Sequence, residues 1–394
     1  MYYAPEVITL EELGIAPELG MVPGLGIVRM RGVDAVRFLQ GQLSNDVARL
    51  SAEQSILAGY HNPQGRTIAL LRLVQWDADG SASGQAAPSD ILAVVPRELA
   101  GVVAGRLGKF VLRAKVKIAD ESAAWRIQGL VDVAARGAGG VANNTRGAAG
   151  TDDAGGGRET AGASGAVGTV GVANTDGLVG GAGMRGAGDD STPRACSPAL
   201  SELPSSVNAQ SRSDGAVFVR LGNEPPRWLV ISPADAPDPM SGSAVGDRQT
   251  WLQLDIAAGL PQVYAATSEE FVAQMLNLDV LNAIAFDKGC YTGQEVIARA
   301  HYRGRVKRRM QRFVSRDACH LAPGESGLLA DGRAFKVVLA TQLPDGRCDF
   351  LAVAPLVGAG QDEARTAAPA GGSSETAPAT LVADQVSLPY SLPD

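Results

Sequence analysis

Apolar residues recur at strand and helix spacing over 22–120 and predict one α+β unit. Asn62-Pro63-Gln64-Gly65 favours a hairpin turn and is flanked by two apolar runs, 55–61 and 67–75. Further strands are predicted at 26–30, 90–95 and 110–118. Helices are predicted after Asp34 and over 97–107. This order of elements is typical of an antiparallel sheet covered by helices.

A second α+β unit is predicted over 121–300, interrupted by a long insertion at 134–214. The insertion consists mainly of small and polar residues, and no aromatic residue lies between Trp125 and Phe218. Such a stretch buries too little apolar surface to offset the entropy cost of ordering, so it is predicted to be disordered. Ordered structure is predicted to resume with three segments: 216–221, 227–231 and 251–261.

Short apolar runs separated by Gly-containing turns predict a small β-barrel over 301–358. Its predicted strands are 312–314, 326–329, 334–341 and 349–353. The low-complexity stretch 359–385 is predicted to be a disordered linker. The apolar peptide that follows it, 386–394, is predicted to dock as a strand.

The composition narrows the classes of function. The 394-residue chain carries a net charge of -7, which excludes binding of nucleic acid by bulk positive charge. Its four cysteines form no C-x-x-C pair and it has three histidines, so neither a disulfide framework nor a self-contained zinc site is expected. The N-terminus lacks the pattern of a secretory signal, and no apolar run approaches the roughly 18 residues of a membrane span. We therefore expect a cytoplasmic protein with reduced thiols that does not enter a membrane.

The most reactive combination of side chains lies in Asp287-Lys-Gly-Cys-Tyr-Thr-Gly-Gln-Glu295. A capping box at Thr292 predicts a helix over about 293–301. Cys290 then lies just before a helix N-terminus and two residues after Lys288, and both neighbours favour a thiolate. The alternative, equally compatible with the spacing, is a helix-entry turn in which Cys290 is a small buried residue.

Two other groups of residues are candidate ligand contacts. A run of cations that surrounds Tyr302 could hold carboxylates or phosphates, contact RNA, or simply form a solvated strand face: Arg299, Arg303, Arg305, Lys307, Arg308, Arg309 and Arg312. Four aromatic residues could stack on a flat heterocycle or pack in the core: Trp251, Phe271, Tyr291 and Tyr302. The sequence supplies no Ser–His–Asp set, paired-carboxylate motif or P-loop.

The segment Lys288-Gly-Cys-Tyr-Thr-Gly-Gln-Glu295, with the basic residues after it, resembles the signature of the YgfZ family. These are folate-binding proteins related to the T-protein (aminomethyltransferase) of the glycine cleavage system. The resemblance covers essentially the whole chain outside the low-complexity stretches, including 38–43, 109–118, 251–261 and 388–392. It implies an α+β, T-protein-like folate-binding fold, with two α+β units and a small C-terminal β-barrel around a central cavity.

The resemblance implies tetrahydrofolate or a derivative as cofactor, and a role in the assembly or repair of iron–sulfur enzymes, including those that thiolate tRNA. Trp251 matches a tryptophan that contacts folate in the family, and Leu25 stands where a second one is found. The rest of the predicted folate site comprises Phe271, Gln274, Tyr291, Glu295, Arg299, Tyr302 and Arg303. Cys290 and Lys288 are the predicted reactive pair, and Cys290 is a candidate transient ligand of an iron–sulfur cluster. Expected partners are tRNA-thiolating iron–sulfur enzymes and, more weakly, tRNA, and the protein is expected to be a monomer.

The acids of the T-protein have no counterpart in this chain. In the T-protein an Asp-Asp pair follows the first hairpin and acts on the folate-bound group, whereas the matching residues here, 65–71, contain no acid. Without a carboxylate to protonate the folate nitrogen, aminomethyl transfer is poorly supported. We therefore expect a non-enzymatic or weakly enzymatic folate-dependent accessory factor rather than an aminomethyltransferase. The alternatives are a folate-dependent one-carbon transferase whose acid comes from elsewhere in the chain, and a tRNA-binding module.

Overall fold

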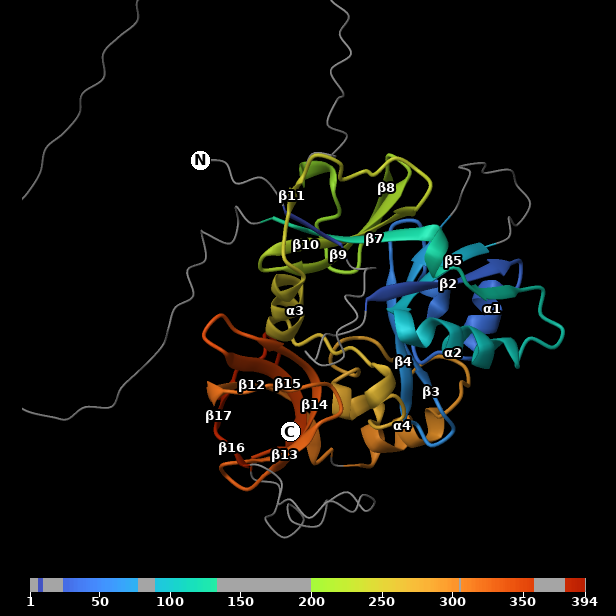
Figure 1. Cartoon of the computed structure of the whole chain (residues 1–394). Helices are drawn as coiled ribbons and strands as arrows, with labels where there is room; N and C mark the ends of the chain where they lie inside the picture. The colour runs from blue at the N-terminus through green and yellow to red at the C-terminus, as the bar shows by residue number, and fades with distance from the viewer. Residues whose placement is uncertain are drawn as a thin grey trace, which may run out of the picture. The chain divides into compact units, whose positions relative to one another are not determined.

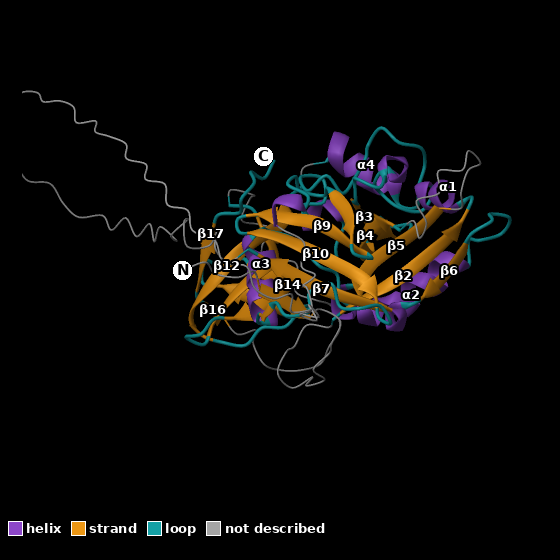
Figure 2. Cartoon of the chain, turned by 90° about the horizontal axis from the view of Figure 1, so that it is seen from above, coloured by secondary structure: helices purple, strands orange, loops and turns teal. Residues whose placement is uncertain are grey.

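The computed structural model describes residues 6–9, 24–76, 89–132, 200–304, 306–357 and 380–393 (Figure 1). All of them belong to one compact unit, Met1–Gly139 with Ala195–Asp394. A second unit, Gly140–Arg194, lies outside the described residues. Strands are the main regular structure of the described chain, and its helices are few and short (Figure 2). Within that part of the chain, no helix is both long and apolar enough to cross a membrane.

The first sheet is antiparallel and has the strand order β3-β4-β5-β2-β6. Its strands are β2 (Leu25–Gly32), β3 (Ile56–His61), β4 (Thr67–Gln75), β5 (Ser89–Pro96) and β6 (Lys117–Asp120). Two helices cover the sheet with buried apolar residues, and both begin where the sequence predicts: α1 (Ala35–Gln40) and α2 (Arg97–Gly108). The predicted strand over 110–118 is wrong for most of its length, since Leu112 is 87% exposed and β6 pairs with β2 only opposite Val28–Arg31.

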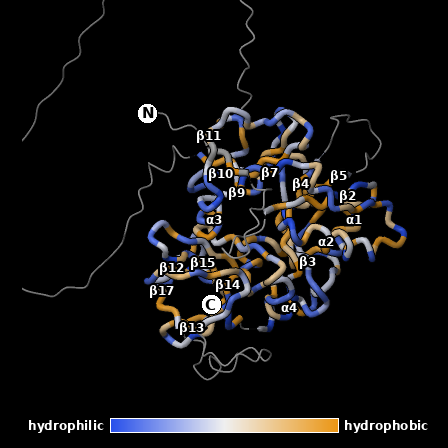
Figure 3. The backbone as a smooth tube through the Cα atoms, in the orientation of Figure 1, coloured by the Kyte–Doolittle hydropathy of each residue, from blue (hydrophilic) through white to orange (hydrophobic). Residues whose placement is uncertain are grey.

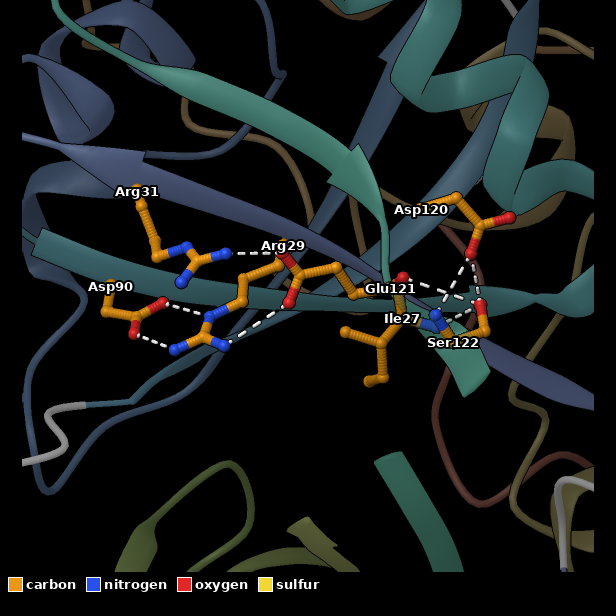
Figure 4. A network of polar contacts seen from close by, with 7 residues as sticks. All are labelled: Ile27, Arg29, Arg31, Asp90, Asp120, Glu121 and Ser122. Carbon is orange, nitrogen blue, oxygen red and sulfur yellow. Dashed lines mark hydrogen bonds and ion pairs between the residues drawn. The ribbon is translucent and has the colours of Figure 1, made fainter. Parts of the chain in front are cut away.

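A network of ion pairs fixes the end of the first sheet (Figure 4). The Arg29 guanidinium bonds to Asp90 on β5 and lies 3.2 Å from a Glu121 carboxylate oxygen. Arg31 contacts the other oxygen of Glu121 at 2.5 Å. One residue on, the Ser122 hydroxyl accepts a 2.9 Å hydrogen bond from the backbone N–H of Ile27. These bonds hold the chain where it leaves β6 and enters the second sheet.

The second sheet has the strand order β11-β1-β7-β10-β9-β8. Its strands are β1 (Glu6–Thr9), β7 (Trp125–Val131), β8 (Gln210–Ser213), β9 (Ala216–Asn223), β10 (Pro226–Pro233) and β11 (Ala244–Val245), and helix α3 (Arg248–Ala257) follows them. The predicted insertion 134–214 is too long, because 200–214 is ordered. Leu203 in this stretch is buried beside Trp228, and β8 pairs with β9, so these residues have both packing and hydrogen bonds.

The third sheet confirms the predicted C-terminal barrel. Its strand order is β16-β13-β14-β15-β12-β17, made of β12 (Arg308–Ala318), β13 (Ser326–Leu329), β14 (Ala334–Gln342), β15 (Arg347–Pro355), β16 (Thr380–Leu381) and β17 (Ala383–Val386). β16 pairs with the edge strand β13 and β17 pairs with the opposite edge strand β12. Because only Val382 separates β16 from β17, this segment joins the two edges and closes the sheet.

The predicted linker 359–385 is therefore wrong at its C-terminal end. Residues 380–385 are strands rather than linker, since Leu381 and Ala383 pack against the barrel core formed by Phe313, Phe335 and Phe350. Residues 358–379 lie outside the described residues. Short apolar and polar stretches alternate along the described chain (Figure 3). The three mainly antiparallel sheets with a few separate helices confirm the predicted α+β class.

His61 at the end of β3 should make the protein sensitive to acid. The side chain is 1% exposed, and burial lowers its pKa from 6.5 to about 3. Between these values the unfolded chain binds a proton that the folded chain does not, so stability present above pH 6.5 is lost as the pH falls toward 3. We expect the free energy of unfolding to fall by at most about 1.4 kcal/mol per pH unit from this residue.

Urea unfolding between pH 7 and pH 4.5 measures this effect. The variant His61→Gln should show a shallower loss of stability with falling pH than the wild-type chain. His320→Gln is the matched control, because His320 is exposed. Equal slopes in all three proteins would contradict the assignment of the acid sensitivity to His61.

Candidate functional site

A cavity lies where the first sheet, the second sheet and α3 meet. Its volume is about 100 Å³, and it is partly open to solvent. The first sheet supplies Leu25, Leu57, Leu70, Arg72 and Val94, and the second supplies Leu221 and Leu229. The remaining wall comes from α3 and the turn after it: Arg248, Trp251, Leu252, Asp255, Leu260, Pro261, Gln262 and Tyr264. An apolar cavity with a few charged groups is typical of a site for a small organic ligand.

One face of α3 carries the polar part of this wall. Asp247 caps the helix by accepting a 3.1 Å hydrogen bond from the Gln249 backbone N–H. Arg248, Trp251 and Asp255 follow at i, i+3 and i+7, so they share one side of the helix. This spacing is readable in the sequence and could have indicated Arg248 and Asp255 beside Trp251.

Trp251 is 4% exposed and is held from two directions. The guanidinium carbon of Arg227 lies 5.0 Å from the centre of the indole ring. Gly129 on β7 lies so close to the ring that an added Cβ would be 2.4 Å from Trp251 Cζ3. The ring is therefore held in a fixed position in the wall of the cavity.

Asp255 is the carboxylate of the cavity. It is paired with Arg227 at 2.6 Å, and the Arg227 side chain is only 2% exposed. Burial raises the pKa of Asp255, while Arg227 and Arg72 act against this rise. Burial also lowers the pKa of Arg72 to about 10. The Arg72 guanidinium is oriented by a 2.7 Å hydrogen bond to Asn208 Oδ1, which comes from the ordered end of the predicted insertion.

Of the residues predicted to bind folate, Trp251 and Leu25 line the cavity and the others do not. Phe271, Gln274 and Tyr291 are buried in the protein core, where the Gln274 side chain donates to the Ile297 carbonyl at 2.7 Å. The remaining four lie on or just after α4 (Gln294–Tyr302) and are exposed: Glu295, Arg299, Tyr302 and Arg303. Tyr302 belongs to a surface cluster in which Phe286 stacks on His301 at 3.9 Å.

The helix after Cys290 forms as predicted, but without the capping box. Its N-cap is Gly293, in the left-handed region at φ +83°, and no side chain caps it. An added Cβ at Gly293 would lie 2.5 Å from the Asn62 carbonyl oxygen, so the turn packs against the hairpin of the first sheet. Cys290 is exposed. The alternative interpretation, in which Cys290 is a small buried residue, is therefore wrong.

Lys288 anchors the Cys290 turn. Its Nζ donates 2.7 Å hydrogen bonds to the carbonyls of Leu43 and Asn45, and it lies 5.2 Å from the centre of the Tyr291 ring. Burial lowers the pKa of Lys288 to about 8, with Asp46 acting in the opposite direction. The ammonium group of Lys288 bonds to these carbonyls rather than to the Cys290 thiol. The role that the structure shows for Lys288 is therefore to position the Cys290 loop.

The basic run divides between structural ion pairs and the surface. Arg309 pairs with Asp279 at 2.8 Å, Arg312 pairs with Asp349 at 2.7 Å, and Arg308 donates to the Ala334 carbonyl at 3.3 Å. Arg305 lies outside the described residues, as does Cys196. Among the described residues, no group of three metal-binding side chains is present.

The fold is that of an aminomethyltransferase T. The solved structure of glycine cleavage system aminomethyltransferase T from Bartonella henselae matches 89% of this chain and 78% of its own chain, with a TM-score of 0.55 and 13% identity. The tRNA-modifying protein YgfZ of Pectobacterium carotovorum subsp. carotovorum (strain PC1) is 28% identical, over 87% of this chain and 81% of that protein. These two similarities confirm the resemblance found in the sequence. No family model matches the chain.

Proposed function

We propose that the protein binds tetrahydrofolate or a derivative in the cavity beside Trp251, and that it acts as an accessory factor for iron–sulfur enzymes that modify tRNA. The observation that carries this proposal is the cavity itself. Leucine is the commonest residue of its walls, and its charged groups are one carboxylate, Asp255, and two guanidinium groups, Arg72 and Arg248. The curated relative is named a tRNA-modifying protein, and the relative with the same fold is an aminomethyltransferase.

The residues of the cavity fit the parts of a folate. A pterin is flat and largely apolar on its faces, which suits the apolar side chains of the walls, Trp251 among them. The N–H groups on the edge of the pterin can donate hydrogen bonds to the Asp255 carboxylate. Arg72 and Arg248 offer positive charge to the glutamate carboxylates of the tail. In this arrangement the ligand charges meet Arg72 and Arg248, and the exposed basic residues of α4 are left for other contacts.

Cys290 is the reactive group in this proposal. Its thiol is exposed at the surface, on a loop anchored by Lys288 and supported by the left-handed Gly293. An exposed thiol can act as a nucleophile or as a transient ligand of an iron–sulfur cluster during transfer. The buried cysteine of the barrel, Cys348, is not available for either role, because burial raises its pKa to about 12.

Complementation in cells that lack their native protein of this kind tests the role. The wild-type chain should restore the thiolated tRNA nucleosides, measured by mass spectrometry, and Cys290→Ala should restore less than about a tenth of that level. Cys319→Ala, in the barrel, is the matched control and should behave as wild type. Full rescue by Cys290→Ala at equal protein level would overturn the assignment of Cys290.

The second candidate is a folate-dependent one-carbon transferase, and Asp255 favours it. The strand that carries the acids in the T-protein has none here, but Asp255 brings a carboxylate with a raised pKa to the cavity from α3. A group of this kind can act in proton transfer. Turnover of methylenetetrahydrofolate by the purified protein, lost in Asp255→Asn, would favour the transferase. The accessory role predicts binding of this compound without turnover.

A further inference from the structure

The C-terminal peptide after β17 packs on the end of α3. Leu388 contacts the largest hydrophobic cluster among the described residues. The Tyr390 hydroxyl donates a 2.7 Å hydrogen bond to the Gly259 carbonyl and accepts one of 3.3 Å from Asn277 Nδ2. Burial raises the pKa of Tyr390 to about 12, so the hydroxyl keeps the proton that it donates at neutral pH. We call residues 387–393 the C-terminal strap.

Gly259 is shaped to receive this strap. It has φ +64°, and its N–H and that of Leu260 close α3 with hydrogen bonds to Ile256 and Asp255. A Cβ at this position would lie 2.7 Å from the Tyr390 hydroxyl and 2.8 Å from Leu388 Cδ2. The glycine therefore provides both the left-handed turn and the space that the strap occupies.

The residues directly after Gly259 form one wall of the cavity. Leu260, Pro261 and Gln262 all line it, and Trp251 and Asp255 lie on the helix that Gly259 ends. The strap therefore holds the turn that joins α3, which carries Trp251 and Asp255, to the rest of this wall.

Asn277, the second hydrogen-bond partner of Tyr390, is bonded to the barrel. Asn277, itself left-handed at φ +58°, donates from Nδ2 to the Met310 carbonyl on β12 at 2.8 Å. The strap also follows directly on β17, the strand that pairs with β12 and completes the closure of the barrel. One continuous segment, β17 and the C-terminal strap, therefore both closes the barrel and positions Tyr390.

We propose that the C-terminal strap positions the wall of the cavity and thereby sets its affinity for the ligand, with Tyr390 as the positioning residue. The identity of the ligand rests on the proposed function, whereas the positioning of the wall does not. The strap makes the cavity dependent on closure of the barrel, although no barrel strand lines the cavity.

Hydrogen–deuterium exchange and calorimetry on the full-length chain test the two parts separately. In Tyr390→Phe without ligand, exchange at 259–264 should rise roughly threefold to tenfold, the range that loss of one hydrogen bond produces. The dissociation constant for tetrahydrofolate should rise by a similar factor at a temperature where both proteins are fully folded. Leu388→Ala should act in the same direction.

A pair of glycine variants provides the matched control. Gly259 and Gly215 both have positive φ, at +64° and +74°, but a Cβ at Gly215 would meet nothing within 4 Å. Gly259→Ala should increase exchange in both the strap and 259–264, whereas Gly215→Ala should change neither. Unchanged exchange at 259–264 in Tyr390→Phe and Gly259→Ala would overturn the positioning role.

The calorimetric outcomes distinguish this inference from the proposed function. Increased exchange with an unchanged dissociation constant would overturn the claim that the strap sets affinity. A wild-type chain that binds no tetrahydrofolate would contradict the proposed ligand, and the exchange measurement would then decide the positioning role alone.

Discussion

Replacing Asp279 with alanine should lower the free energy of unfolding by about 3–5 kcal/mol, the range found when one partner of a buried ion pair is removed. Arg309 donates to both oxygens of Asp279, at 3.0 and 2.8 Å, and the two side chains are 4% and 8% exposed. The variant leaves the guanidinium buried without its counter-charge, since its other bonds go to uncharged oxygens of Gln274 and Asn277. Urea denaturation at neutral pH measures the loss.

The control is a pair of the same chemistry at the surface. Arg316 and Asp384 are also bonded, but their side chains are 62% and 59% exposed, so water solvates either charge when the other is removed. Asp384→Ala should therefore change stability little. If Asp279→Ala and Asp384→Ala lowered it equally, the buried pair would not have the structural role assigned to it.

Gly129→Ala should weaken ligand binding by about tenfold or more, equivalent to about 1.4 kcal/mol. The added methyl would lie 2.4–3.0 Å from three ring atoms of Trp251, so the indole or the strand must move. Overpacking of this kind costs about 1–3 kcal/mol, and here the displaced ring is part of the cavity wall. Binding of tetrahydrofolate by calorimetry and the emission maximum of the tryptophans both report the change.

Gly105→Ala is the control for this variant. Gly105 lies in α2, and a Cβ there would meet nothing within 4 Å, so binding should match wild type. Wild-type affinity in Gly129→Ala would show that the position of the Trp251 ring does not matter for the ligand.

Local patterns predicted the elements well where each element is stabilised by its own neighbours. The hairpin around 62–65, the helix after Gly293 and the barrel strands are all readable from spacing and turn residues. Strand β8 and the barrel-closing segment β16–β17 were not predicted, because their sequences are polar or low in apolar content. They are ordered by sheet edges that come from distant parts of the chain, β9 for the first and β12 and β13 for the second.

The candidate site was harder to predict, because its polar groups come from separate sheets. Trp251 was found from the sequence, and Asp255 shares its helical face. Arg227 and Arg72, however, lie on strands of two different sheets, and no spacing connects them with α3. The role of the basic run was hard to predict for the same reason. Arg309 is neutralised by Asp279 and Arg312 by Asp349, and both aspartates are about 30 residues or more away in the sequence.

A fluorescence titration with tetrahydrofolate tests the central claim most directly. Trp228 provides the matched control for Trp251, because it is also buried but packs against Leu203 and bonds to the Pro204 carbonyl, away from the cavity. The account predicts a saturable change in tryptophan emission for the wild-type chain and for Trp228→Leu. In Trp251→Leu the change should be lost, and calorimetry should show affinity weaker by about tenfold or more. Absence of saturable binding by the wild-type chain, or equal affinity in Trp251→Leu, would contradict a folate site in this cavity.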